Sequence, residues 1–196
     1  MSISRRDLLK SLSVTAIAGS ALCIVRLEAA ENAHRMVRAE KDKSSSSGYS
    51  PKYFSAHQYE TLRALCNAII PPDHESGGAI EAGAPEFIDL LTSENKDYQL
   101  QLGDGIIWLN STCIERFSQP YLNCDPARQV EILDLIAYRK NAEKDSRLNP
   151  GIAFFSMLRK LTADGFFTSE IGINYLGYIG NTYLKEFPGC PAIPET

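Results

Sequence analysis

Apolar and polar positions follow the helical repeat through most of the chain. Ser55 and Gln58 form a capping-box pair, which predicts that a helix begins there. Two consecutive prolines, Pro71 and Pro72, predict its end because proline cannot continue a helix. The apolar positions between these signals lie three or four residues apart and form one helical face: Leu62, Leu65, Cys66, Ile69 and Ile70.

A loop and a second helix are predicted next. Residues 73–83 contain three glycines and no apolar period, which indicates a loop. Pro85 suits the first turn of a helix that presents Phe87, Leu90 and Leu91 to a core. Two such short helices cannot bury their apolar faces on each other alone, so they need the rest of the chain.

A long helix follows, with one apolar stripe that ends before Pro120: Tyr98, Leu102, Ile106, Leu109, Cys113 and Phe117. Gly103 and Gly105 weaken this helix by about 1 kcal/mol each relative to alanine. Glycine at these positions predicts that another stretch of backbone approaches the helix closely.

Two more helices are predicted from their caps. Asp125 caps a helix with Pro126 in its first position, and its predicted buried face comprises Val130, Leu133, Ile136 and Ala137. Its basic end, residues 139–147, is predicted to face solvent. Asn149-Pro150 begins the next helix, which Asp164-Gly165 is predicted to stop.

The aromatic residues of the C-terminal region lie among glycines and prolines. They are Phe166, Phe167, Tyr175, Tyr178, Tyr183 and Phe187, and a short helical segment is predicted to begin at Ser169-Glu170. These aromatics either wrap the domain's own core or form a docking surface, since interfaces favour tyrosine and phenylalanine. No segment alternates with period two, so we predict an all-α domain of about five to six helices with an irregular tail.

The first thirty residues resemble an export signal. Arg5 and Arg6 precede an apolar run, residues 12–25, that is too short for a comfortable membrane span. Paired arginines at this position indicate the twin-arginine route; the alternative is an amphipathic or membrane-anchoring helix. No clean small-x-small cleavage site follows, so an uncleaved segment would anchor the chain to the inner membrane. Residues 31–50 are charged and then serine-rich, which predicts a flexible tether before a domain at 51–196.

Composition and charge narrow the class of protein. The 196 residues are 44% hydrophobic and 22% charged, which suits one folded domain. A net charge of −4 and a sequence pI near 5.4 argue against nucleic acid as a partner.

The sequence lacks the common cofactor motifs. Gly103-Asp104-Gly105 lacks the third glycine and the preceding strand of a dinucleotide fingerprint, and no Cys-x-x-Cys pair or haem-attachment motif occurs. We therefore predict no cofactor on this chain. Asp73, His74 and Glu75 are candidate metal ligands, so a free-standing periplasmic ligand- or metal-binding protein is the alternative function. A third possible function is a hydrolase whose catalytic residues are far apart in the sequence and meet only in the folded chain.

Four cysteines lie beyond the signal segment. Cys113 and Cys124 are closest in sequence and are a candidate disulfide, whereas Cys66 on an apolar stripe suits the core. Cys190 is a candidate for pairing with another chain. Export would expose these thiols to an oxidising compartment.

Several of these segments together resemble the signature of the gluconate 2-dehydrogenase subunit 3 family. The first part comprises Leu65–Pro72, Gly77–Ala79 and Ala82–Asp89, and the closing part comprises Leu161–Gly172, Leu176–Asn181 and Phe187–Pro191. The resemblance spans about residues 54–191 in the family's order. The chain departs from the family at Pro72-Asp73-His74, where relatives often have a threonine-rich loop.

The resemblance implies a role in a complex. Members are the small, cofactor-free subunit of membrane-associated periplasmic dehydrogenases. Their large subunit is an FAD-containing protein of the glucose-methanol-choline type, and electrons pass to a cytochrome subunit with haem c or to another acceptor. The small subunit would escort the large one through the twin-arginine translocase and stabilise it. The residues that we expect to dock the large subunit are Pro71, Pro72, Gly77, Gly78, Phe87, Phe166, Phe167, Tyr178 and Phe187.

Overall fold

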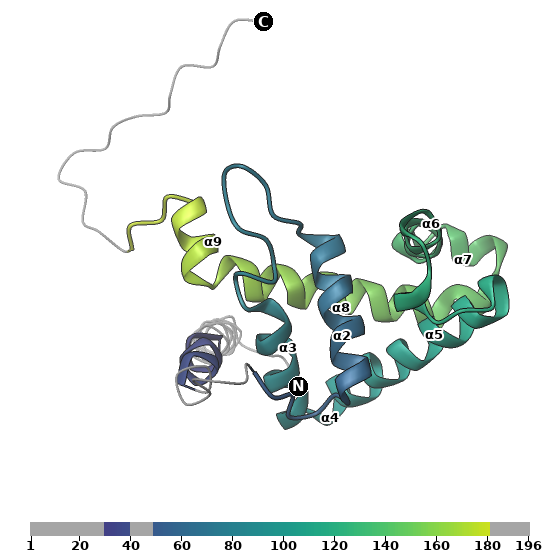
Figure 1. Cartoon of the computed structure of the whole chain (residues 1–196), viewed down its shortest axis with the longest axis horizontal. Coiled ribbons are helices and arrows are strands. Elements are labelled where there is room, and N and C mark those ends of the chain that lie inside the picture. The colour runs from purple at the N-terminus through teal and green to yellow at the C-terminus, as the bar shows by residue number, and fades with distance from the viewer. Residues whose placement is uncertain (1–29, 40–48, 181–196) are drawn as a thin grey trace, which may run out of the picture.

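The computed structural model describes residues 30–39 and 49–180, and every regular element in these ranges is helical (Figure 1). This confirms the all-α prediction. Besides a helix at residues 30–39, the elements are α2 (Ala56–Ile69), α3 (Ala84–Glu94), α4 (Lys96–Tyr98), the π-helical turn η1 (Gln99–Gly103), α5 (Asp104–Phe117), the 3-10 turn η2 (Tyr121–Asn123), α6 (Pro126–Ala137), α7 (Asn141–Lys144), the 3-10 turn η3 (Ser146–Leu148), α8 (Asn149–Phe167) and α9 (Glu170–Tyr175).

Helix α8 is the centre of the fold. It is 19 residues long and contacts α2, α3, α5, α6 and α9, so most of its circumference is buried. Its fully or almost fully buried side chains include Phe154, Leu158, Leu161 and Phe166. The other helices lie along and across it, with α9 at one end and α6 and α7 near the other (Figure 1).

Three of the predicted helix starts are confirmed by their hydrogen bonds, whereas Asn149, predicted as a cap, is the first residue of α8 and makes no capping bond. The Ser55 hydroxyl accepts from the Gln58 N–H at 3.3 Å, and the Gln58 side chain accepts from the Ser55 N–H at 3.0 Å. Asp125 accepts from the Arg128 N–H at 3.0 Å, and Ser169 accepts from the Gly172 N–H at 3.1 Å. These bonds satisfy N–H groups that have no partner within the first helical turn.

Two predicted details of α8 and α6 are wrong. Helix α8 continues through Asp164-Gly165 to Phe167, because Gly165 serves close packing instead of a helix stop: a Cβ there would lie 3.2 Å from the Ala84 Cα of α3. Val130 is 57% exposed, whereas Ile132 and Ile136 form the buried stripe of α6.

The two glycines near the start of α5 make room for side chains, not for backbone as predicted. A Cβ at Gly105 would overlap the ring of Phe154, and one at Gly103 would lie 2.8 Å from the Tyr53 hydroxyl. Gly151 of α8 makes room for the Trp108 ring, because a Cβ there would overlap that ring. Helices α5 and α8 therefore pack together through aromatic rings that lie against glycines of the opposite helix.

The N-terminal part of the predicted tether is helical. Within residues 30–39, Ala33 and Val37 are buried in the common hydrophobic core. Their four-residue spacing places both on one face of the helix, which is enough to dock a short segment. The signal segment with Arg5 and Arg6 lies outside the described residues, and within the described ranges no helix is long and apolar enough to cross a bilayer.

Candidate docking surface

The loop between α2 and α3 is held in one conformation by its own residues. Backbone N–H groups of Ser76 and Glu75 donate to the Asp73 carboxylate at 2.8 and 2.9 Å. These bonds hold the pKa of Asp73 below its usual value, because they favour the charged form. The carboxylate predicted as a metal ligand therefore closes a turn instead.

Glycine is required where this loop folds back on α2. A Cβ at Gly78 would lie 2.6 Å from the Pro72 nitrogen, closer than real contacts allow. The Gly78 N–H donates to the Glu81 carboxylate at 2.8 Å, and the Ala79 N–H donates to the Ile70 carbonyl at 2.9 Å. The double-proline end of α2 and the glycine pair thus act together to make the loop rigid.

Helix α9 lies beside this loop. A Cβ at Gly77 would be 3.5 Å from the Ile171 Cδ1, so the two segments are neighbours (Figure 1). The turn between α8 and α9 is sharp: a Cβ at Gly172 would overlap the Phe166 carbonyl, and the Ser169 hydroxyl donates to that carbonyl at 2.6 Å. Loop and helix together form one end of the molecule.

Large apolar side chains are exposed at this end. Five of them, which we call the apolar end surface, lie on α9 or directly before and after it: Phe167, Tyr175, Leu176, Tyr178 and Ile179. Their exposed fractions range from 41% to 79%. A concentration of this kind within one short segment is typical of surfaces that bind another protein.

The predicted docking residues divide into three groups. Pro71 and Pro72 are exposed on the loop, and Phe167 and Tyr178 belong to the apolar end surface. Gly78 allows the loop to fold back onto Pro72, and Gly77 lies beside Ile171 of α9. The prediction is wrong for two aromatics, because Phe87 and Phe166 are each 98% buried in the chain's own packing. Phe187 lies outside the described residues.

The helix at residues 30–39 packs against the same end. His34 stacks on the Phe87 ring with 4.9 Å between centroids, and its Nε2 lies 2.8 Å from the Thr168 hydroxyl. Arg38 forms an ion pair with Glu170 of α9. Burial lowers the pKa of His34, and the neighbouring Arg38 lowers it further.

A buried carboxylate that the sequence analysis missed fixes the chain ahead of α2. Asp89 of α3 is fully buried and accepts four hydrogen bonds from residues 49–54. The Tyr49 hydroxyl and the Lys52 N–H donate at 2.8 and 2.6 Å, and the N–H groups of Tyr53 and Phe54 donate at 3.1 Å each. Burial and the bond to Asp89 raise the pKa of Tyr49.

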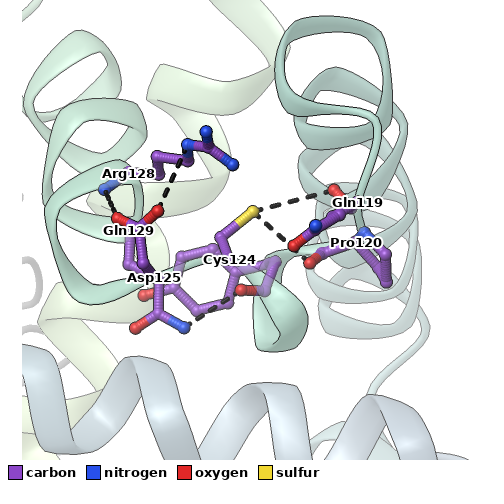
Figure 2. A network of polar contacts seen from close by, with 7 residues as sticks. Gln119, Pro120, Cys124, Asp125, Arg128 and Gln129 are labelled. Carbon is purple, nitrogen blue, oxygen red and sulfur yellow. Dashed lines mark hydrogen bonds and ion pairs between the residues drawn. The ribbon is translucent and has the colours of Figure 1, made fainter.

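The three described cysteines are buried free thiols. Cys66 lies in the core as predicted, where burial raises its pKa to about 12. Cys113 and Cys124 are neighbours, and burial together with the Cys124 thiol raises the pKa of Cys113 to about 12. Figure 2 shows the Cys124 thiol directed at the carbonyls of Gln119 and Pro120, at 3.7 and 3.5 Å. The disulfide between Cys113 and Cys124 stays a prediction, and Cys190 lies outside the described residues.

The remaining candidate ligands do not converge. The His74 side chain is 91% exposed at the loop tip, where its Nε2 lies 3.7 Å from a Glu75 carboxylate oxygen. In the part of the chain that the structure describes, no three His, Cys, Asp or Glu side chains are grouped so that they could hold a metal ion.

The fold and the surface define an all-α protein whose candidate site is an exposed face for contact with another molecule. A family model described as gluconate 2-dehydrogenase subunit 3 matches residues 56–189, which is most of the chain. The chain belongs to that family. Comparisons with curated proteins and with solved structures gave no match.

Proposed function

We propose that this chain is the non-catalytic small subunit of a membrane-associated periplasmic dehydrogenase of the gluconate 2-dehydrogenase type. The family match carries this proposal, because it covers both the rigid loop and the apolar end surface. The large subunit would hold FAD, belong to the glucose-methanol-choline type and oxidise a sugar or sugar acid. A further subunit with haem c would accept the electrons.

The contribution of this chain to the complex is binding. Full burial of an exposed large apolar side chain gains about 1.5–3 kcal/mol, and side chains that are 41–79% exposed gain correspondingly less. Ordering costs are small where the surface is already rigid, and Asp73, Gly78 and Glu81 hold the loop through their internal contacts. A preformed surface of this kind suits a subunit that binds and stabilises a larger protein.

The same chain would escort its partner out of the cytoplasm. The twin-arginine route carries folded cargo, so one signal on the small subunit serves a large subunit that is already bound and loaded with FAD. Arg5 and Arg6 are the residues on which this export depends.

Replacing Arg5 and Arg6 by lysine tests the escort role. We expect dehydrogenase activity and both subunits to remain in the cytoplasm, because lysine does not replace the arginine pair of the signal. Arg26→Lys, outside the pair, is the control and should leave periplasmic activity unchanged. Normal periplasmic activity in the paired variant would contradict the proposal. The measurement is activity in fractionated cells, with immunodetection of both subunits.

A further inference from the structure

A groove runs along part of α8, away from the apolar end surface. Its volume is 490 Å³, and α8 lines it from Asn149 to Lys160. Gln101 of η1 lines it too, as does Arg139 at the corner between α6 and α7. The groove thus lies where the π-helical turn, the corner and the central helix meet.

The lining of the groove combines small, apolar and basic side chains. Ala153 and Ser156 are small, and Met157 adds an apolar side chain between them and Lys160. The charged residues of the lining are Arg139 and Lys160, and both are exposed. No carboxylate belongs to the lining, although the whole chain has a net charge of −4.

The surrounding corner is also basic. Residues 139–147 contain four basic and two acidic side chains. One of each, Arg147 and Asp145, neutralise each other in an ion pair at 2.9 Å. Arg139 is exposed, as predicted for this stretch, and it also lines the groove. An acidic protein therefore presents a local positive surface here, which attracts carboxylates.

The shape of the groove suits a polypeptide segment. Lys160 lies eleven positions after Asn149, which is about 16 Å along a helix axis. That length accommodates about three turns of a partner helix or about five extended residues. Apolar side chains beside basic ones match a segment that carries both aliphatic residues and carboxylates.

We propose that this groove is a second docking site, and that its occupant is a segment of the flavoprotein partner in which carboxylates flank apolar side chains. The inference rests on the proposed function, because it takes the large subunit as the partner. Arg139 and Lys160 would pair with the carboxylates, and Ala153, Ser156 and Met157 would contact the apolar side chains. Charge at the groove would set the orientation of the segment.

Charge reversal tests the groove with a matched control. Arg139→Glu with Lys160→Glu is introduced into the tagged full chain in its own cell, and the flavin that copurifies with the chain is measured. The control is Lys96→Glu with Arg159→Glu, two exposed cations outside both the lining and residues 139–147, with the same total charge change. We expect binding to weaken about tenfold in the groove variant, and far less in the control.

Two further readouts identify the occupant. A photo-crosslinking residue in place of Ser156 should capture a flavoprotein peptide that contains Asp or Glu next to apolar residues, whereas one at Arg159 should not. Lysine in place of the captured carboxylate should restore binding of the groove variant. Thermal unfolding of each variant reports on the fold, which exposed substitutions should leave unchanged.

The outcomes separate the two proposals. Equal flavin retention by the groove variant and the wild type would overturn the groove proposal alone, and so would equal losses in the groove and control variants. A wild-type chain that copurifies no flavoprotein would refute the proposed function and the groove proposal with it.

Discussion

At the scale of single residues, Asp89 shows how much one buried carboxylate can organise. It joins α3 to residues 49–54 through four hydrogen bonds, three of them from backbone N–H groups. The sequence shows only an aspartate among Phe87, Ile88, Leu90 and Leu91, and an acid in such an apolar run is a signal that was available. The partners themselves are about 35 to 40 positions away, so local pattern could not name them.

Asp89→Asn should destabilise the fold. The amide presents N–H groups where N–H donors already point, so we expect the free energy of unfolding to fall by about 3 kcal/mol. Asp134→Asn, on an exposed position of α6, should change it by less than about 0.5 kcal/mol. Urea denaturation followed by circular dichroism measures both, and equal stability of the two variants would show that the Asp89 contacts contribute little.

Residue type alone could not assign the aromatics of the signature. Phe166 and Phe167 are adjacent and identical, yet Phe166 is buried and Phe167 is exposed. Consecutive helical residues point about 100° apart, so the rotation of α8 in the core decides which one faces out. Sequence reasoning assigned both rings to docking and could not separate the buried one from the exposed one.

At the scale of elements, the sequence predicted features that depend on neighbouring residues better than features that depend on contacts far away in the chain. The caps at Ser55, Asp125 and Ser169 act within three residues, and each was predicted correctly. The helix at residues 30–39 was missed because its stability comes from Phe87, Thr168 and Glu170, which are far away in sequence. Short helices rarely form without such tertiary contacts.

Docking of this helix should weaken in mild acid. The pKa of His34 is lowered in the docked state, so the undocked helix binds the proton more tightly. Docking is therefore complete above the ordinary pKa of 6.5 and is lost progressively as pH falls below it. Protonation would add a cation to a pocket between residues 30–39, the end of the α2–α3 loop and α9. The charged residues that line this pocket beside His34 are Arg35, Arg38, Glu31, Glu81 and Glu170.

Hydrogen exchange of the amides in residues 30–39 measures this effect. We expect protection, corrected for intrinsic rates, to be lower at about pH 5.5 than at about pH 7.5. His34→Gln keeps a hydrogen-bonding side chain but cannot titrate, so it should remove the difference. His57→Gln, on the exposed first turn of α2, should leave it intact. A pH response that persists in His34→Gln would assign it to other groups.

At the scale of the whole molecule, the chain is a helical body with candidate contact surfaces at different places along α8. The α2–α3 loop and α9 lie at one end of α8, and α6 and α7 lie near the other (Figure 1). The apolar end surface belongs to the first end, and the basic groove lies beside the α6–α7 corner. The sequence predicted the fold class and the loop, whereas the docking role of the loop and of the apolar end surface stays a prediction. It could not predict the groove, because Gln101, Arg139 and Lys160 meet only in the folded chain.

The central claim is that this chain acts by binding a larger flavoprotein. Its most direct measurement is size-exclusion chromatography of the tagged chain, purified from its own cell, with flavin absorbance recorded. The account predicts that the chain elutes with flavin at a mass well above its own 21.7 kDa. Tyr178→Ser with Ile179→Ser should release the flavoprotein, because both side chains belong to the apolar end surface. A colourless wild-type chain that elutes alone would contradict the account.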